Sequence, residues 1–382
     1  MTMARAALPG LIALSGLAGT STGMFSPLIA ALLTRAGVDE FGVGLASTLF
    51  FAALACVAPM APACIARFGA RSTLATGVLI AALAGAALPW TAGLAAWSAL
   101  RLAMGAGVAL YMVASQTALN QLVDDAHRAT SNGLQALAFG VGLGVGPVMG
   151  AALDRLSPTL AFAAAGAALG LGLPLALATL PRLGSRCPEA RRPVLGRIGL
   201  ALHASLAYGA AEASLLALYP VYLLHAGADL HAVGIAFAAF VGGSLIATLP
   251  LAKLADRAGH GRVIAACGLA AIGSVIGLVG SAPDHVWLWS ALCGASIGPV
   301  YALALADIGQ RLGAAADLAS GNSAFTVAFS LGSMLAPVVT GWLMHAFGDA
   351  QVFSVTIVLF ASLVLHWLIR RPRIAAAPAV RA

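Results

Sequence analysis

The sequence predicts an all-α membrane protein whose twelve transmembrane helices form two duplicated six-helix bundles. Three observations carry this prediction: an apolar composition, regularly spaced hydrophobic segments, and an internal repeat. Of the 382 residues, 61% are hydrophobic and 9% are charged, whereas soluble domains contain about 25% charged residues. This composition excludes a soluble domain and predicts a chain that crosses the membrane many times.

The predicted spans are apolar segments close to the roughly 20 residues that a helix needs to cross a bilayer. They cover residues 8–33, 43–63, 73–90, 94–119, 132–153, 159–180, 199–224, 232–251, 263–281, 286–308, 319–343 and 351–369. The first segment also has the basic start of a signal peptide. We expect it to be a true span, because the repeat aligns it with the internal segment 199–224.

The repeat has an offset of 190 residues and needs no gaps. The offset pairs scarce residue types in order: Arg67 with Arg257, Asp39 with Asp229, Tyr111 with Tyr301, Asn132 with Asn322, and Pro147 with Pro337. We therefore predict a first bundle at 1–181 and a second at 199–382. Between them, the arginine-rich and proline-containing segment 182–198 is expected to be a cytoplasmic linker.

Charge predicts the orientation in the membrane. All 20 Lys and Arg residues except Arg35, Arg101 and Arg155 fall in the linker, the termini or the loops on the same side. Because cytoplasmic loops are enriched in Lys and Arg, we expect both termini in the cytoplasm and a multi-pass protein of the inner (plasma) membrane. The net charge of +7 therefore does not indicate nucleic-acid binding, and the five cysteines show no metal-binding or disulfide spacing.

Three motifs resemble those of the major facilitator superfamily. The segment AKLADRAGHGR at 252–262 is similar to the family's loop signature and matches it at Leu254, Ala255, Asp256, Arg257 and Gly259. The first-half copy keeps Arg67, Gly69 and Arg71 but has Ala66 at the acidic position. The run from Arg101 to Ala109 resembles the family's helix-four motif, and Gly142-x-x-x-Gly146-Pro147-x-x-Gly150 resembles a motif of its antiporter branches.

This resemblance implies a transporter that works by alternating access, with gating residues in the motifs. The gating candidates are Asp256, Arg257, Gly259, Arg67, Gly69, Gly142, Gly146, Pro147 and Gly150. The three glycines lie four apart on one helical face, which is either a simple packing face or a face that seals against the other half. Pro147 should kink its helix. Asp256 could latch onto a helix start near 131–133, or simply belong to a solvated turn.

Polar residues within the spans predict a cavity near the middle of the membrane. The substrate-cavity candidates are Thr22, Ser26, Gln116, Gln135, Tyr208, Tyr301, Asn322 and Thr326, together with Thr20, Ser21 and Ser296. For any single Ser or Thr, a hydrogen bond to its own helix is the simpler interpretation.

Two charged residues are the candidates for proton coupling. Arg101 stays protonated and should face the interior, where backbone carbonyls or a polar cavity can accept its hydrogen bonds. Glu212 is the carboxylate nearest the centre of a span, and burial favours its neutral form. It could carry a proton, remain permanently protonated in a structural role, or bind substrate without coupling.

The resulting functional prediction is a secondary active transporter, not an enzyme, for a small molecule. Motifs for nucleotide hydrolysis, metalloprotease or serine-hydrolase chemistry are missing from the sequence. Proton-coupled efflux of an amphiphilic compound is favoured; the alternative is proton-linked uptake of a sugar or carboxylate, followed by a membrane enzyme or a receptor. We expect a monomer in the lipid bilayer, with protons as the coupling ion and no cofactor, metal or nucleic acid.

Overall fold

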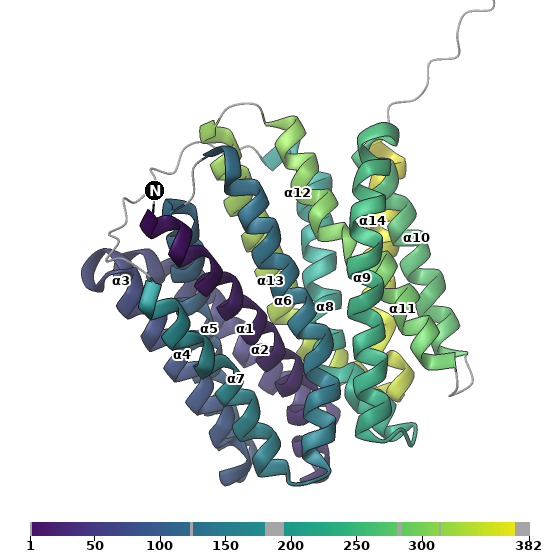
Figure 1. Ribbon diagram of the computed structural model, residues 1–382. Helices are drawn as coiled ribbons and strands as arrows, with labels where there is room; N and C mark the ends of the chain where they lie inside the picture. The colour runs from purple at the N-terminus through teal and green to yellow at the C-terminus, as the bar shows by residue number, and fades with distance from the viewer. Residues whose placement is uncertain (1, 123–124, 180–194, 281–284, 313–314, 371–382) are drawn as a thin grey trace, which may run out of the picture.

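The computed structural model describes residues 2–122, 125–179, 195–280, 285–312 and 315–370. Within them the regular secondary structure is helical (Figure 1). The first half contains α1 (Thr2–Arg35), α2 (Glu40–Val57), η1 (Ala58–Met60), α3 (Ala61–Phe68), α4 (Ala70–Ala87), η2 (Leu88–Trp90), α5 (Leu94–Leu122), α6 (Asp125–Asp154) and α7 (Pro158–Thr179). The second half contains η3 (Leu195–Arg197), α8 (Gly199–His225), α9 (Leu230–Ala258), α10 (His260–Val279), α11 (Val286–Ile297), α12 (Pro299–Arg311), α13 (Ala315–Phe347), η5 (Asp349–Phe353) and α14 (Ser354–Arg370).

The helices confirm the predicted membrane fold. In the described residues, 11 helical stretches are long and apolar enough to cross a bilayer, and the shorter apolar helix Pro158–Pro174 falls on the remaining predicted span. Most of the predicted linker lies outside the described residues, so the boundary at 182–198 stays a prediction.

Two spans are less regular than the sequence predicted. The second, which includes Pro59, passes from α2 through the 3-10 turn η1 into α3. The tenth is one span, Val286–Arg311, as predicted, but its helix is interrupted at Gly298, between α11 and α12. The reason is Pro299, which has no N–H group to donate to the preceding turn. A Cβ on Gly298 would collide with Ser244 of α9, so a small residue is needed where these helices meet.

The two halves start their second spans with the same cap. Asp39 accepts a hydrogen bond from the backbone N–H of Gly42 at 2.8 Å, and its repeat counterpart Asp229 accepts one from Ala232 at 2.8 Å. Such side-chain caps satisfy donors that a helix start leaves free. The Ala232 bond, helped by Arg155, lowers the pKa of the Asp229 carboxyl, so this cap stays charged until the pH falls below that lowered value.

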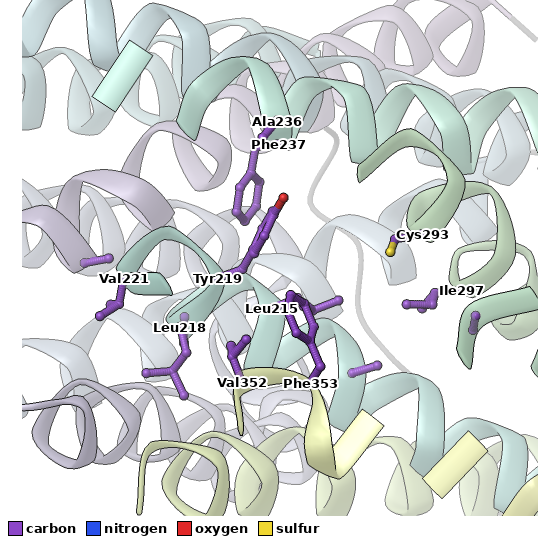
Figure 2. Packing of buried hydrophobic residues seen from close by; sticks show 14 of the residues in the cluster. Leu215, Leu218, Tyr219, Val221, Ala236, Phe237, Cys293, Ile297, Val352 and Phe353 are labelled. Atoms are coloured by element: carbon purple, nitrogen blue, oxygen red, sulfur yellow. The ribbon is translucent and has the colours of Figure 1, made fainter. Parts of the chain in front are cut away.

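Helix α8 forms the centre of the second-half core (Figure 2). The Tyr219 ring lies 6.1 Å from that of Phe237 on α9 and 6.0 Å from that of Phe353 in η5. Its hydroxyl is 2.6 Å from Ser290 Oγ on α11, so the polar end of a 3%-exposed side chain is satisfied. A tyrosine placed in this way packs against several helices at once, and its buried hydroxyl group still has a hydrogen-bond partner.

The contacts between halves gather toward one end of the molecule, which we call the closed end. It contains the turns at 35–40, 154–158, 225–230 and 347–349; the opposite end, the linker end, contains the turns at 68–70 and 258–260. Toward the closed end, α2 packs on α13 and α6 packs on α9. The two helix pairs are equivalent under the repeat, and each has a glycine at its closest approach. A Cβ on Gly44 of α2 would collide with the Pro337 carbonyl of α13, and a Cβ on Gly234 of α9 would lie 2.9 Å from the Pro147 carbonyl of α6.

We expect Gly44→Ala to open the closed end. Overpacking a tight contact costs roughly 1–3 kcal/mol, or about a tenfold change in population per 1.4 kcal/mol. The measurement is maleimide labelling of Ala30→Cys, at a 1%-exposed cavity position, in a chain without its five native cysteines. Gly170→Ala is the control, because a Cβ there meets nothing within 4 Å. Equal labelling of the Gly44 and Gly170 variants would contradict the prediction.

Candidate substrate and coupling site

A cavity that is open to solvent lies mainly within the first half, with one wall from α8 of the second half. Its polar lining comes from Ser21, Thr22 and Ser26 of α1, Ser47 of α2, and Arg101 and Tyr111 of α5. The remaining lining is aliphatic or aromatic, and α8 contributes Ala213, Leu216 and Ala217.

Arg101 faces this cavity, as the sequence predicted. Its Nε donates to the Ala46 carbonyl at 3.3 Å, and Nη2 donates to Ser47 Oγ at 3.4 Å. The guanidinium carbon lies 4.4 Å from the centre of the Phe50 ring, a cation–π contact. A guanidinium has five N–H donors, and these two bonds are long, so it can still donate to a ligand.

Ser26 joins the halves at the repeat axis. Its hydroxyl donates to the carbonyl of Leu216, the residue 190 positions later. Residues that are equivalent under a two-fold relation can touch only near its axis, so this contact lies close to the axis that relates the halves. Thr22 also lines the cavity, although its hydroxyl bonds to Ala18 of its own helix at 2.9 Å.

Glu212 lies outside this cavity lining, in a second cluster within the other half. The Tyr208 hydroxyl donates to Glu212 Oε1 at 3.1 Å, and the Tyr208 ring lies 5.4 Å from that of Tyr301 on α12. Phe329 of α13 packs on both tyrosines, at 6.1 and 5.9 Å. Among the described residues, no Lys, Arg or His lies within 4 Å of the Glu212 carboxylate.

The two groups of residues are related by the repeat. Thr22 corresponds to Glu212, and Tyr111 corresponds to Tyr301. In the first half the space around these positions is a cavity. In the second half it holds the rings of Tyr208, Tyr301 and Phe329. The duplicated site has therefore become asymmetric, with the cation on one side and the carboxylate on the other.

Three of the other predicted cavity residues form hydrogen bonds elsewhere: Gln135, Ser296 and Thr20. Gln135 donates to Ser115 Oγ at 3.0 Å and thus links α6 to α5, while Gln116 and Thr326 have exposed side chains. Ser296 bonds to its own helix, and so does Thr20. The side chain of Asn322 lies outside the described part. Ser47 and Phe50 were not predicted, although Ser47 is a polar residue within a span, which is the signal that identified the other candidates.

The glycine face of α6 packs within its own half. Cβ atoms on Gly142 and Gly146 would collide with the backbone of α1, and one on Gly150 would lie 3.3 Å from Met24 of α1. Of the two interpretations of this face, the structure therefore shows close packing inside the bundle, which the glycines permit. Helix α6 contacts α9 through a different face, which includes the Pro147 carbonyl. It remains one helix through Pro147.

The loop signature forms turns at the linker end. Gly69 and Gly259 have φ of 85° and 95°, which glycine adopts without strain. Asp256 is 71% exposed and lies 3.9 Å from His260 Nε2; Arg257 is exposed, and Arg67 lies over the Phe68 ring at 5.3 Å. The predicted latch assumed a helix start at 131–133, which is wrong: α6 begins at Asp125, and the terminal charge fades within the first turn.

Comparison with known proteins places the chain in a family. The Major Facilitator Superfamily model matches residues 11–200 and again 200–381. The transporter YfkF of Bacillus subtilis, described as MFS-type, is 27% identical over 376 residues, with 95% of each chain covered. Another MFS-type transporter, from Enterobacter sp. (strain 638), is 25% identical over 354 residues, with 91% of each covered.

Solved structures show the same fold at low identity. The nucleoside transporter NupG has a TM-score of 0.80 at 13% identity, covering 95% of this chain and 99% of its own. A bacterial homologue of the lysosomal transporter Spinster, in an inward-facing and unoccupied conformation, has a TM-score of 0.75 at 15% identity, covering 96% and 95%. With its duplicated bundles and family matches over both halves, this chain belongs to the major facilitator superfamily of membrane transporters.

Proposed function

We propose that this transporter exports an amphiphilic small molecule in exchange for protons. The observation that carries the proposal is the difference between the halves. The first half has a largely apolar cavity with one guanidinium, and the second has a carboxylate without a basic partner within 4 Å among the described residues. An amphiphile can bury its apolar body against Phe50 and Val108 and direct an acceptor group to Arg101. A sugar would require more hydrogen-bonding groups than this lining offers.

The orientation follows from the charges. Because most Lys and Arg among the described residues lie at the linker end, whereas the closed end has Arg35 and Arg155, we place the linker end in the cytoplasm. The closed end then faces outward, and we infer that the cavity is reached from the cytoplasm. In this orientation an exported compound enters from the inside, and the loop turns at Gly69 and Gly259 lie where the cytoplasmic gate has to close.

Glu212 is the proton carrier in this proposal. It has no basic partner within 4 Å among the described residues, so a proton is the cation most readily available to neutralise it. It also directly precedes Ala213, a residue of the cavity wall, and α8 touches α1 through Leu216 and Ser26. A movement of α8 that changes the cavity therefore also changes the access of water to Glu212.

A flux experiment in proteoliposomes tests the proposal. Amphiphilic compounds, sugars and small carboxylates are each assayed with an imposed pH gradient of either sign. Movement of an amphiphile against the direction of proton flow, abolished by collapsing the gradient, is the expected result. Accumulation of a sugar or carboxylate in the direction of proton flow would instead establish the uptake alternative. Flux that ignores the pH gradient would contradict proton coupling.

A further inference from the structure

A histidine–carboxylate cluster joins the two halves at the closed end. His225 is the last residue of α8, Glu40 is the first of α2, and Asp349 is the first of η5. His225 Nδ1 lies 3.0 Å from Asp349 Oδ1 and 3.6 Å from Glu40 Oε1. One ligand atom from each residue lies within 4.8 Å of the other two. Glu40 comes from the first half, whereas its two partners come from the second.

A second histidine extends the cluster. His345, near the end of α13, has Nδ1 at 3.6 Å from Glu40 Oε2 and at 3.7 Å from Asp39 Oδ2. The carboxylate of Glu40 therefore lies between two imidazoles, one on each of its oxygens. The side chains of His225, Glu40 and Asp349 are 31%, 17% and 40% exposed, so an ion from solution can reach them.

The repeat shows what is unusual about these histidines. The first-half counterparts of His225 and His345 are Arg35 and Arg155. Both arginines form ordinary ion pairs, at 2.7 Å with Asp154 and 2.9 Å with Asp229. A guanidinium is always protonated and has no lone pair for a metal, whereas a neutral imidazole is the commonest metal ligand. Both equivalent positions in the second half thus carry the side chain that can bind a cation.

We propose that His225, Glu40 and Asp349 bind a divalent transition-metal ion such as Zn²⁺. Zn–N and Zn–O bonds of about 2.0–2.2 Å in a tetrahedral site separate the ligand atoms by about 3.3–3.6 Å. The separations from His225 Nδ1 are 3.0 and 3.6 Å, and all three ligand atoms lie within 4.8 Å of one another, so rotation of the side chains can bring them to this spacing. Three protein ligands leave the fourth position to water. One imidazole with carboxylates suits Zn²⁺ better than Mg²⁺ or Ca²⁺, which prefer oxygen ligands alone.

The bound ion ties the halves together at the end where they already touch. Opening of this end separates Glu40 from His225 and Asp349, so an ion held by all three stabilises the closed arrangement. Zn²⁺ should therefore inhibit any transport cycle that requires this end to open. This consequence needs only alternating access, and does not depend on the substrate or on proton coupling.

Binding is measured by calorimetry with Zn²⁺ and the purified full-length chain. His225→Ala and Asp349→Asn should each weaken binding by about tenfold or more, since even indirect partners of a metal site contribute 10- to 100-fold. His285→Ala is the matched control, because His285 is an exposed histidine at the same end. Size-exclusion profiles verify that each variant is folded. Unchanged affinity in His225→Ala, or Mg²⁺ binding as tight as Zn²⁺ binding, would overturn the proposal.

The variant His225→Arg separates a metal site from an ion pair. It introduces the residue that the first half carries, keeps a cation beside Glu40 and Asp349, and removes the metal ligand. Zn²⁺ should protect Ala30→Cys from maleimide in the cysteine-free parent and leave labelling unchanged when His225→Arg is added. Equal protection in both chains would show that Zn²⁺ acts elsewhere and would refute the site.

Discussion

Glu212→Gln should abolish pH-driven accumulation of substrate while leaving exchange down the substrate's own gradient intact. The substitution keeps the shape of the neutral acid, and its amide can still accept the hydrogen bond from Tyr208. A carrier without a titrating group can equilibrate substrate but has no free energy from protons to concentrate it. The ratio of substrate concentrations inside and outside the proteoliposomes should therefore fall to about one. The inward-open and outward-open states then no longer differ in protonation, so the pH gradient cannot favour one over the other.

Two further variants make this result specific. Glu212→Asp retains an ionisable group and should keep part of the pH-driven accumulation. Asp307→Asn removes another buried carboxylate, one already paired with Arg311 at 2.6 Å, and should leave coupling in place wherever the protein folds. If the Gln variant still concentrates substrate against a gradient, Glu212 is not the coupling site.

Arg101→Ala should raise the substrate concentration for half-maximal transport by about tenfold or more, since it removes the charged donor to the substrate's acceptor group, and a hydrogen bond to a charged group is worth about 1.5–3 kcal/mol. Arg101→Lys should also impair transport, because it keeps the charge but loses the planar group that reaches Ala46 and Ser47 while lying over Phe50. Expression should be preserved in both variants. Substrate titrations in proteoliposomes provide the measurement.

Controls distinguish a cavity role for Arg101 from a structural one. Phe50→Leu removes the ring beneath the guanidinium and should reproduce part of the Arg101→Lys defect. Arg35→Lys, in an exposed ion pair with Asp154, should leave the substrate dependence unchanged, because exposed pairs contribute little. Full activity in Arg101→Ala would mean that Arg101 only anchors α5 to α2.

The fold was predictable because a bilayer imposes simple rules. A span needs about 20 apolar residues with its backbone satisfied inside the helix, so segment lengths and the 190-residue repeat were enough to identify two six-helix bundles. The interior position of Arg101 followed from the cost of a cation in hydrocarbon. The division of the tenth span was missed because Pro299 was treated as part of an apolar run, although its missing N–H group interrupts the helix.

Sequence alone determined the membrane class, the duplicated halves and the charged residues inside the spans, because each depends on composition or spacing along the chain. Only the tertiary structure decided which residues share a site. It put Thr22 and Arg101 in one cavity and Glu212 in a separate aromatic cluster, and it turned the glycine face of α6 toward α1. It also brought Glu40, His225 and Asp349 together. Residues so far apart in the chain meet only through helix packing, which no local pattern encodes.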